Sequence, residues 1–140
     1  MARDIFERKI QQIKDEILLL GSMVGQATLD SVKAFKNKDI DAANTIIEED
    51  QAINDKRFAI ENAIMILFAT QQPLAHDLRL LSAMFLVSNE LERMGDYAKG
   101  IASNTVRLGT AELPAPIQDI EKMAELGVSM LHRALSAFVN

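Results

Sequence analysis

A heptad pattern in the first quarter of the chain strongly limits what the protein can fold into. Between residues 4 and 36, apolar or small side chains recur at alternating spacings of three and four residues. The positions are Phe6, Ile10, Ile13, Ile17, Leu20, Val24, Ala27, Ser31 and Ala34. This spacing lines up one stripe along a helix and is typical of helical bundles and coiled coils. The pattern predicts a long helix that packs lengthwise against other helices.

Two further long helices are expected downstream. Asp39 is expected to cap the second helix, which runs to about Thr70. Pro73 is expected in the first turn of the third helix, which reaches Leu108 and ends at Gly109. The second helix has an apolar stripe that Asp50 and Arg57 interrupt: Ala43, Ile46, Ile53, Ile60, Ile64 and Leu67. The third helix is apolar on two sides, one with Leu74, Leu78, Leu81 and Phe85, the other with Met84, Val87, Leu91, Met94, Ala98 and Ile101.

Length and composition support the same architecture. The chain has 140 residues, of which 49% are hydrophobic and only 5% aromatic. A core made of Leu, Ile, Met, Val and Ala favours helix packing over a β-sandwich. The predicted fold class is therefore all-α: an elongated antiparallel three-helix bundle, followed by the first helix of a second bundle.

A partial internal repeat predicts this fourth helix. The Ala34-Phe35 pair and Asn37 return 103 residues later, at the C-terminal end of the sequence. We therefore expect residues 1–110 to form one bundle, and residues 111–140 to be a linker at Pro114–Pro116 and the first helix of an incomplete repeat, as in a fragment of a longer protein. The expected apolar stripe of the fourth helix is Leu113, Ile120, Met123, Met130 and Ala137. Another copy of the chain is expected to cover this stripe, which predicts a homo-oligomer.

Charge and residue usage exclude several classes of function. The net charge is −5, which argues against direct nucleic-acid binding. No cysteine is present, so disulfides, thiolate zinc sites and cysteine nucleophiles are excluded. The longest apolar run, residues 63–69, is too short to span a bilayer. Any effect on transcription would have to act through other proteins.

Two polar pairs are the candidate site. Asp50 and Asn54 lie four residues apart on the second helix, as do Glu92 and Asp96 on the third. Like charges at this spacing repel by ~0.2–0.5 kcal/mol, so we expect another interaction to offset the repulsion between Glu92 and Asp96. If the two helices run antiparallel, the pairs converge, and four oxygen donors suit a hard cation or carboxylate-bound iron. A solvated polar stripe with intrahelical ion pairs, including Lys99, fits the spacing as well.

Three motifs, taken together and in order, resemble the PhoU family of phosphate-signalling proteins. They are Asp50 with Asn54 after an acidic run, Gln72-Pro73-x-Ala75-x-Asp77-Leu78-Arg79, and Glu90-Leu91-Glu92-Arg93-Met94-Gly95-Asp96. The resemblance covers residues 6–140 and implies tandem three-helix bundles, of which this chain contains the first and the opening of the second.

The resemblance also implies a function. It points to a cytoplasmic, non-enzymatic adaptor between the ATP-binding subunit of the phosphate ABC transporter and a sensor histidine kinase, peripheral to the membrane through these partners. Such a protein regulates phosphate uptake and holds phosphate-starvation signalling off when phosphate is plentiful. The alternatives are a metal-dependent enzyme or metal store on a carboxylate bundle, and a purely structural scaffold.

A metal site is implied by the same family. Its members carry E(D)xxxD motifs that bind multinuclear iron or zinc clusters. Glu92 and Asp96 match this motif in full, whereas Asn54 puts an amide where the Asp50 motif would have its second carboxylate. The implied metal ligands are therefore Asp50, Asn54, Glu92 and Asp96.

Overall fold

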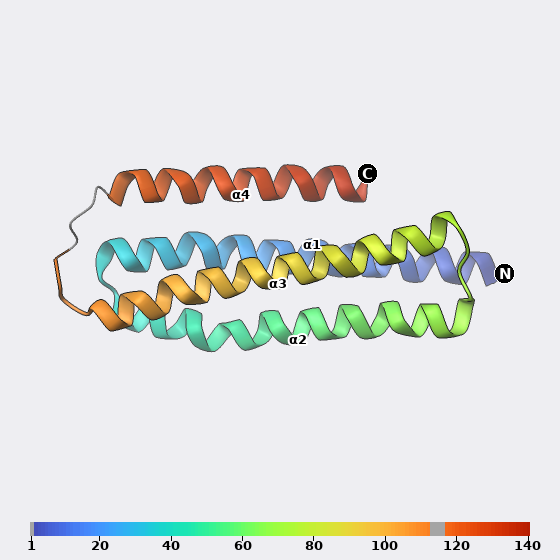
Figure 1. Ribbon diagram of the computed structural model, residues 1–140, viewed down its shortest axis with the longest axis horizontal. Coiled ribbons are helices and arrows are strands. Elements are labelled where there is room, and N and C mark those ends of the chain that lie inside the picture. Colours follow the sequence, from blue (N-terminus) through green and yellow to red (C-terminus); the bar gives the residue numbers. More distant parts are fainter. Residues whose placement is uncertain (1, 113–116) are drawn as a thin grey trace.

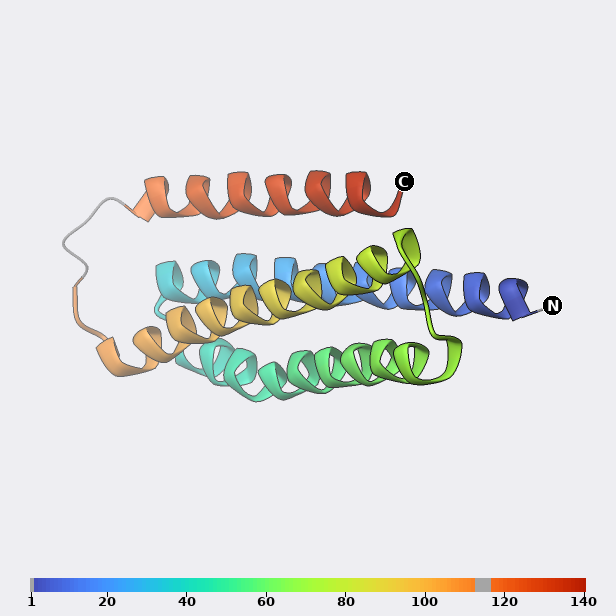
Figure 2. The ribbon, with the colours of Figure 1, turned by 45° about the vertical axis from the view of Figure 1, so that its right-hand side comes forward.

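The computed structural model describes residues 2–112 and 117–140, which form four helices. They are α1 (Ala2–Asn37), α2 (Ile40–Gln71), α3 (His76–Leu108) and α4 (Ile117–Val139). The first three make an elongated antiparallel bundle, and α4 lies along α1 on the side away from α2 (Figures 1 and 2). The predicted all-α bundle is confirmed. No helix in the described part of the chain combines the length and apolarity needed to cross a membrane.

The buried stripes of α1 and α2 follow the heptad prediction. Every position predicted for α1 is buried except Ala27, which is partly buried against the core. All six apolar positions predicted for α2 are buried, and so is Asp50 between them. Because burial of each large aliphatic side chain stabilises a fold by about 1.5–3 kcal/mol, these stripes hold the bundle together.

In α3 the prediction of two apolar sides is wrong in part. The buried stripe has one clean heptad register: Leu81, Met84, Ser88, Leu91, Gly95, Ala98, Ala102 and Thr105. Leu78 is exposed, and Leu74 precedes the helix with 79% of its surface exposed. The polar members of the stripe do not break it, because the hydroxyls of Ser88 and Thr105 donate to backbone carbonyls of their own helix at 2.8 and 3.1 Å.

The connection between α2 and α3 also differs from the prediction. The sequence places Pro73 inside the first turn of the third helix, but it lies in the connection before α3 begins at His76. Two residues with positive φ explain the later start. Gln72 ends α2 in the left-handed conformation, and Ala75 has φ +52° and ψ −114°, which is not helical. The helix can therefore begin only after Ala75.

The predicted capping residues are confirmed. Asp39 precedes α2, and its carboxylate accepts a hydrogen bond from the backbone N–H of Ala42 at 3.0 Å. Gly109 follows α3 with φ +56°, and its N–H donates to the carbonyl of Thr105 at 3.1 Å. A glycine suits this position because it adopts positive φ without a steric penalty.

The fourth helix packs on its own chain with a face that the sequence pattern does not predict. Among the described helices, α4 contacts only α1, and its buried residues are Val128, Leu131 and Leu135. Two members of the predicted stripe, Met123 and Met130, are 71% and 69% exposed. That register is therefore wrong, while Leu113 and the linker at Pro114–Pro116 lie outside the described residues.

Two glycines in α1 explain which face of α4 packs against it. A Cβ atom on Gly21 would overlap Leu135 Cδ1, and one on Gly25 would lie 3.4 Å from Val128 Cγ1. The two glycines leave a shallow surface into which the branched side chains of α4 fit. The division of the chain at residue 110 and the contact with another copy stay predictions.

Candidate functional site

The four candidate residues lie where α2 and α3 approach each other near the middle of the bundle. Gly95 permits the approach, since a Cβ atom there would lie 3.2 Å from Ile53 Cγ2 and 3.7 Å from Asp50 Oδ1. The antiparallel arrangement brings Asp50 close enough to Asp96 and Glu92 for their charges to interact. We call Asp50, Asn54, Glu92 and Asp96 the α2/α3 polar cluster.

Asp50 is the most buried member of the cluster, with 4% of its side chain exposed. Its Oδ2 atom accepts a hydrogen bond from Asn54 Nδ2 at 3.3 Å and lies 3.7 Å from the ammonium of Lys99 on α3. Burial raises the pKa of this carboxyl, the Lys99 charge opposes the increase, and the Asp96 charge adds to it. Asp50 is thus a buried acid held by one cation and one amide.

Glu92 and Asp96 form a pair through their side chains. Burial raises the pKa of Glu92, and a hydrogen bond to Asp96 and the charge of that residue raise it further. The nearby charge of Arg57 partly offsets the increase. Glu92 therefore retains a proton more readily than an isolated glutamate does.

Arg57 and Lys99 bring positive charge to the cluster, and neither is among the site residues that the sequence predicts. Arg57 Nη1 binds Glu61 Oε1 at 3.0 Å, and the guanidinium lies over the ring of Phe58 at 4.2 Å from its centroid. Its Nε atom is buried without a hydrogen-bond partner. Lys99 pairs across helices with Asp50 rather than along α3. The available signal was the position of Asp50 in an apolar stripe, which requires a counter-charge from a facing helix.

The residues fit a metal cluster only in part. Carboxylate and amide oxygens have the right chemistry for hard cations, iron and zinc. Within residues 2–112 and 117–140, however, no group of three or more His, Cys, Asp and Glu side chains is arranged to hold a metal ion. The polar cluster as it stands is therefore not a preformed metal centre.

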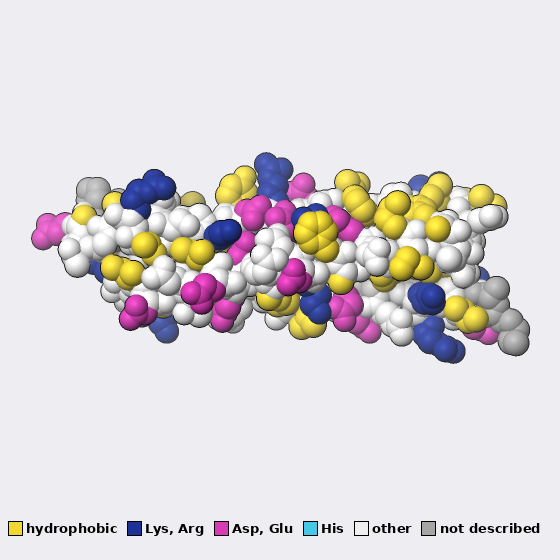
Figure 3. Space-filling view, turned by 90° about the horizontal axis from the view of Figure 1, so that it is seen from below, with side chains coloured by type: hydrophobic (Ala, Val, Ile, Leu, Met, Phe, Trp, Pro, Cys, Tyr) yellow, Lys and Arg dark blue, Asp and Glu magenta, His cyan; other side chains and the backbone are white. Residues whose placement is uncertain are grey.

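A crevice of about 520 Å³ gives access to Asp50. All three bundle helices contribute to it, and its polar lining includes Asp30, Glu49, Asp50 and Lys99. Seen from the side on which α2 lies, acidic side chains gather near the middle of the molecule (Figure 3). Hydrophobic side chains gather on the same face toward the end that carries the N-terminus of α1.

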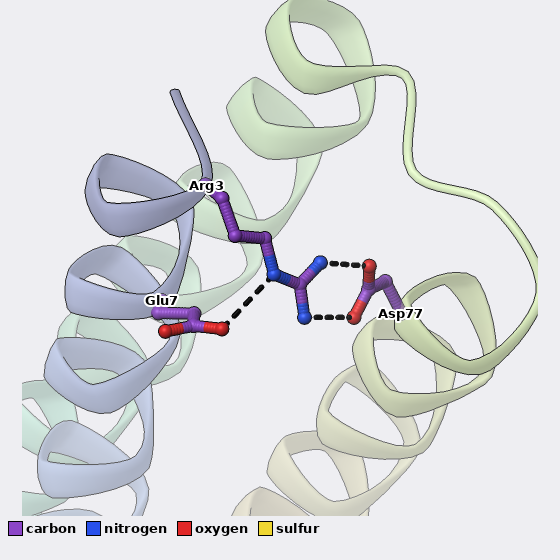
Figure 4. A network of polar contacts seen from close by, with 3 residues as sticks. All are labelled: Arg3, Glu7 and Asp77. Atoms are coloured by element: carbon purple, nitrogen blue, oxygen red, sulfur yellow. Dashed lines mark hydrogen bonds and ion pairs between the residues drawn. The ribbon is translucent and has the colours of Figure 1, made fainter. Parts of the chain in front are cut away.

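The Gln72–Arg79 motif has a structural contact at that end of the bundle. Arg3 on α1 binds both carboxylate oxygens of Asp77 on α3 at 2.5 and 3.3 Å, and its Nε atom binds Glu7 at 2.9 Å (Figure 4). The Arg3 guanidinium lowers the pKa of Asp77. This motif residue therefore ties α3 to α1 and is not part of the polar cluster.

Comparison with known proteins finds a matching domain family and similar relatives. Residues 17–105 match the PhoU domain. The chain is 34% identical over 140 residues to the phosphate-specific transport system accessory protein PhoU homolog of Clostridium acetobutylicum, with 99% of this chain and 64% of that protein covered. It is 32% identical over 133 residues to the phosphate-specific transport system accessory protein PhoU of Escherichia coli, with 95% of this chain and 55% of that protein covered.

A solved structure agrees with these matches. The crystal structure of the phosphate transport system regulatory protein PhoU from Streptococcus pneumoniae is similar with a TM-score of 0.85 and 32% sequence identity. The likeness covers 94% of this chain and 62% of the other. The present chain therefore spans somewhat over half the length of the relatives it matches. With the domain match and the shared fold, the chain belongs to the PhoU family.

Proposed function

We propose that this chain regulates phosphate uptake as an accessory protein of a phosphate transporter. The observation that carries the proposal is the match of nearly the whole chain to relatives named as phosphate-specific transport system accessory proteins. The role is non-enzymatic: the chain is an adaptor between the ATP-binding subunit of the transporter and a sensor histidine kinase. It acts in the cytoplasm, is peripheral to the membrane through these partners, and keeps starvation signalling off when phosphate is plentiful.

The surface of the bundle supports an adaptor role. Phe58 and Met65 of α2 are 58% and 55% exposed, and their spacing of seven residues places them on one face of the helix. Leu86 and Tyr97 of α3 are exposed as well. Contiguous exposed apolar patches with a polar rim mark surfaces that bind other proteins.

A reporter assay tests the regulatory role. The chain is expressed in a bacterium that lacks its own accessory protein and carries a reporter for phosphate starvation. In phosphate-rich medium the chain should lower reporter output relative to the empty vector. The variant Phe58→Ser/Met65→Ser should lose this effect, while Met123→Ser/Met130→Ser, which changes two exposed apolar side chains on α4, should keep it. Reporter output that the chain leaves unchanged would count against the proposal.

We also propose that Glu92 and Asp96 bind iron or zinc more strongly than any other carboxylate pair of the chain. Their separation of four residues places the two carboxyl groups on the same face of α3, close enough for their charges to interact. The metal content of the purified protein, and its metal affinity in a calorimetric titration, should both be lower in Glu92→Ala/Asp96→Ala than in the native chain. The matched pair Glu121→Ala/Glu125→Ala, also four residues apart but on α4, should leave both unchanged. Equal metal content in the two double variants would contradict this assignment.

A further inference from the structure

The buried carboxylate of Asp50 has a cation of its own. A carboxylate that is 4% exposed needs a partner, because transfer of an unpaired charge from water to a protein interior is very unfavourable. Lys99 provides this partner: its Nζ lies 3.7 Å from Asp50 Oδ2, and 45% of the lysine side chain stays in solvent. The ammonium can therefore remain hydrated while it neutralises the buried acid.

The local backbone makes the contact possible. Gly95 precedes Lys99 by one helical turn and lies directly against Ile53 and Asp50. Without a side chain at this position, α3 can approach α2 closely, and the next turn carries the lysine to the Asp50 carboxylate. Lys99 and Asp50 line the same crevice, so an ion that approaches the Asp50 carboxylate through this crevice also approaches the Lys99 ammonium.

The second contact of Asp50 also competes with a metal. Asn54 points its amide nitrogen, a donor, at Asp50 Oδ2 at 3.3 Å. A metal ion bound directly to Asp50 would lie about 2.0–2.6 Å from the carboxylate oxygen. It would have to displace the amide from this oxygen and would be repelled by the ammonium of Lys99 at close range.

We propose that Lys99 is the resident counter-cation of Asp50 and keeps this carboxylate from binding a divalent metal ion. The role agrees with the finding that no group of three His, Cys, Asp or Glu ligands forms among the described residues. Within the α2/α3 polar cluster, this role leaves Glu92 and Asp96 as the carboxylates open to a metal ion. The inference concerns Asp50 and does not rest on the regulatory role proposed above.

Titration with Mn²⁺ at pH 7, followed by electron paramagnetic resonance of the free ion, tests the proposal. Lys99→Met removes the ammonium and keeps the stem of the side chain, and we expect it to bind Mn²⁺ at least about tenfold more tightly than the native chain. Lys99→Arg keeps the charge and should behave like the native chain. In Lys99→Met/Asp50→Asn, the gain should disappear.

Three results would overturn the proposal. They are a Lys99→Met affinity within about twofold of the native one, a gain that survives Asp50→Asn, and a Lys99→Arg affinity as high as that of Lys99→Met. Circular dichroism checks that each variant is folded. Lys99→Gln, a second neutral substitution at this half-exposed position, replaces the methionine variant if the latter does not fold.

Discussion

Leu135 of α4 packs directly over Gly21 of α1, so closely that a Cβ atom on this glycine would overlap Leu135 Cδ1. Any larger residue at position 21 therefore forces Leu135 to move. Leu135 is buried, which limits the room for that movement. Gly21 is thus the point at which α4 depends most on the sequence of α1.

We therefore predict that Gly21→Ala destabilises the protein by ~1–3 kcal/mol, the usual effect of overpacking. Gly100→Ala is the matched control, because Gly100 is also inside a helix but a Cβ atom there would have no neighbour within 4 Å. It should stabilise the protein by up to ~1 kcal/mol through helix propensity. Chemical denaturation measures both. If Gly21→Ala is as stabilising as Gly100→Ala, the close packing of α4 on α1 is wrong.

A second prediction concerns the ion pair of Arg3 and Asp77 at the end of the bundle. The pKa of Asp77 is lowered from its ordinary value of 3.8, so the folded state binds a proton here less readily than the unfolded state. The contribution to stability is present above pH 3.8 and is lost as the pH falls through the lowered value. Asp77→Asn should lower the unfolding temperature at pH 7, and this effect should diminish in acidic solution, below pH 3.8.

Coupling between the two residues provides the control for this prediction. In an Arg3→Met background, Asp77→Asn should have little effect on the unfolding temperature at either pH, because the partner of the carboxylate is already gone. A destabilisation that is the same in neutral and in acidic solution would show that charge pairing with Arg3 is not its cause.

A third prediction concerns Glu92, whose contribution to stability depends on pH in the opposite direction. The pKa of Glu92 is raised above its ordinary value of 4.5, so the folded state binds a proton here more readily than the unfolded state. Stability is therefore lost as the pH rises from 4.5 through the raised value. Glu92→Gln removes this loss while an amide can still donate to Asp96. It should raise the unfolding temperature at pH 7 and leave it unchanged near pH ~4.

The neighbouring residue Glu90 makes a suitable comparison. It lies on the same helix, two residues before Glu92, with 70% of its side chain exposed. Glu90→Gln should not reproduce the stabilisation. Thermal unfolding of both variants between pH ~4 and pH 7 tests this prediction. A lower unfolding temperature of Glu92→Gln than of the native chain at pH 7 would contradict the raised pKa of Glu92.

The bundle itself can be predicted from the sequence because its heptad pattern is nearly unbroken. The buried stripes of α1 and α2 follow directly from the heptad pattern. Asp39 and Gly109 are recognisable as capping residues, since capping depends on local chemistry. The register of α3 is harder to read because Ser88 and Gly95 occupy core positions, and neither looks like a core residue in a sequence.

Features that depend on contact between distant residues could not be predicted. Helix α4 has apolar side chains on more than one face, and only the glycines of α1 select Val128, Leu131 and Leu135 over the two methionines. The positive φ of Ala75, which delays the start of α3, has no local signal either. At the site, the position of Asp50 in an apolar stripe indicated a counter-charge from a facing helix, but not that Lys99 of α3 provides it.

The most direct test of the proposed function is binding to the transporter. The purified chain is titrated into the ATP-binding subunit of a phosphate ABC transporter, and binding is followed by calorimetry. The proposal predicts a saturable complex, at least about tenfold weaker for Phe58→Ser/Met65→Ser and unchanged for Met123→Ser/Met130→Ser. No binding by the folded native chain, or equal weakening by both double variants, would contradict an adaptor that uses the exposed apolar face of α2.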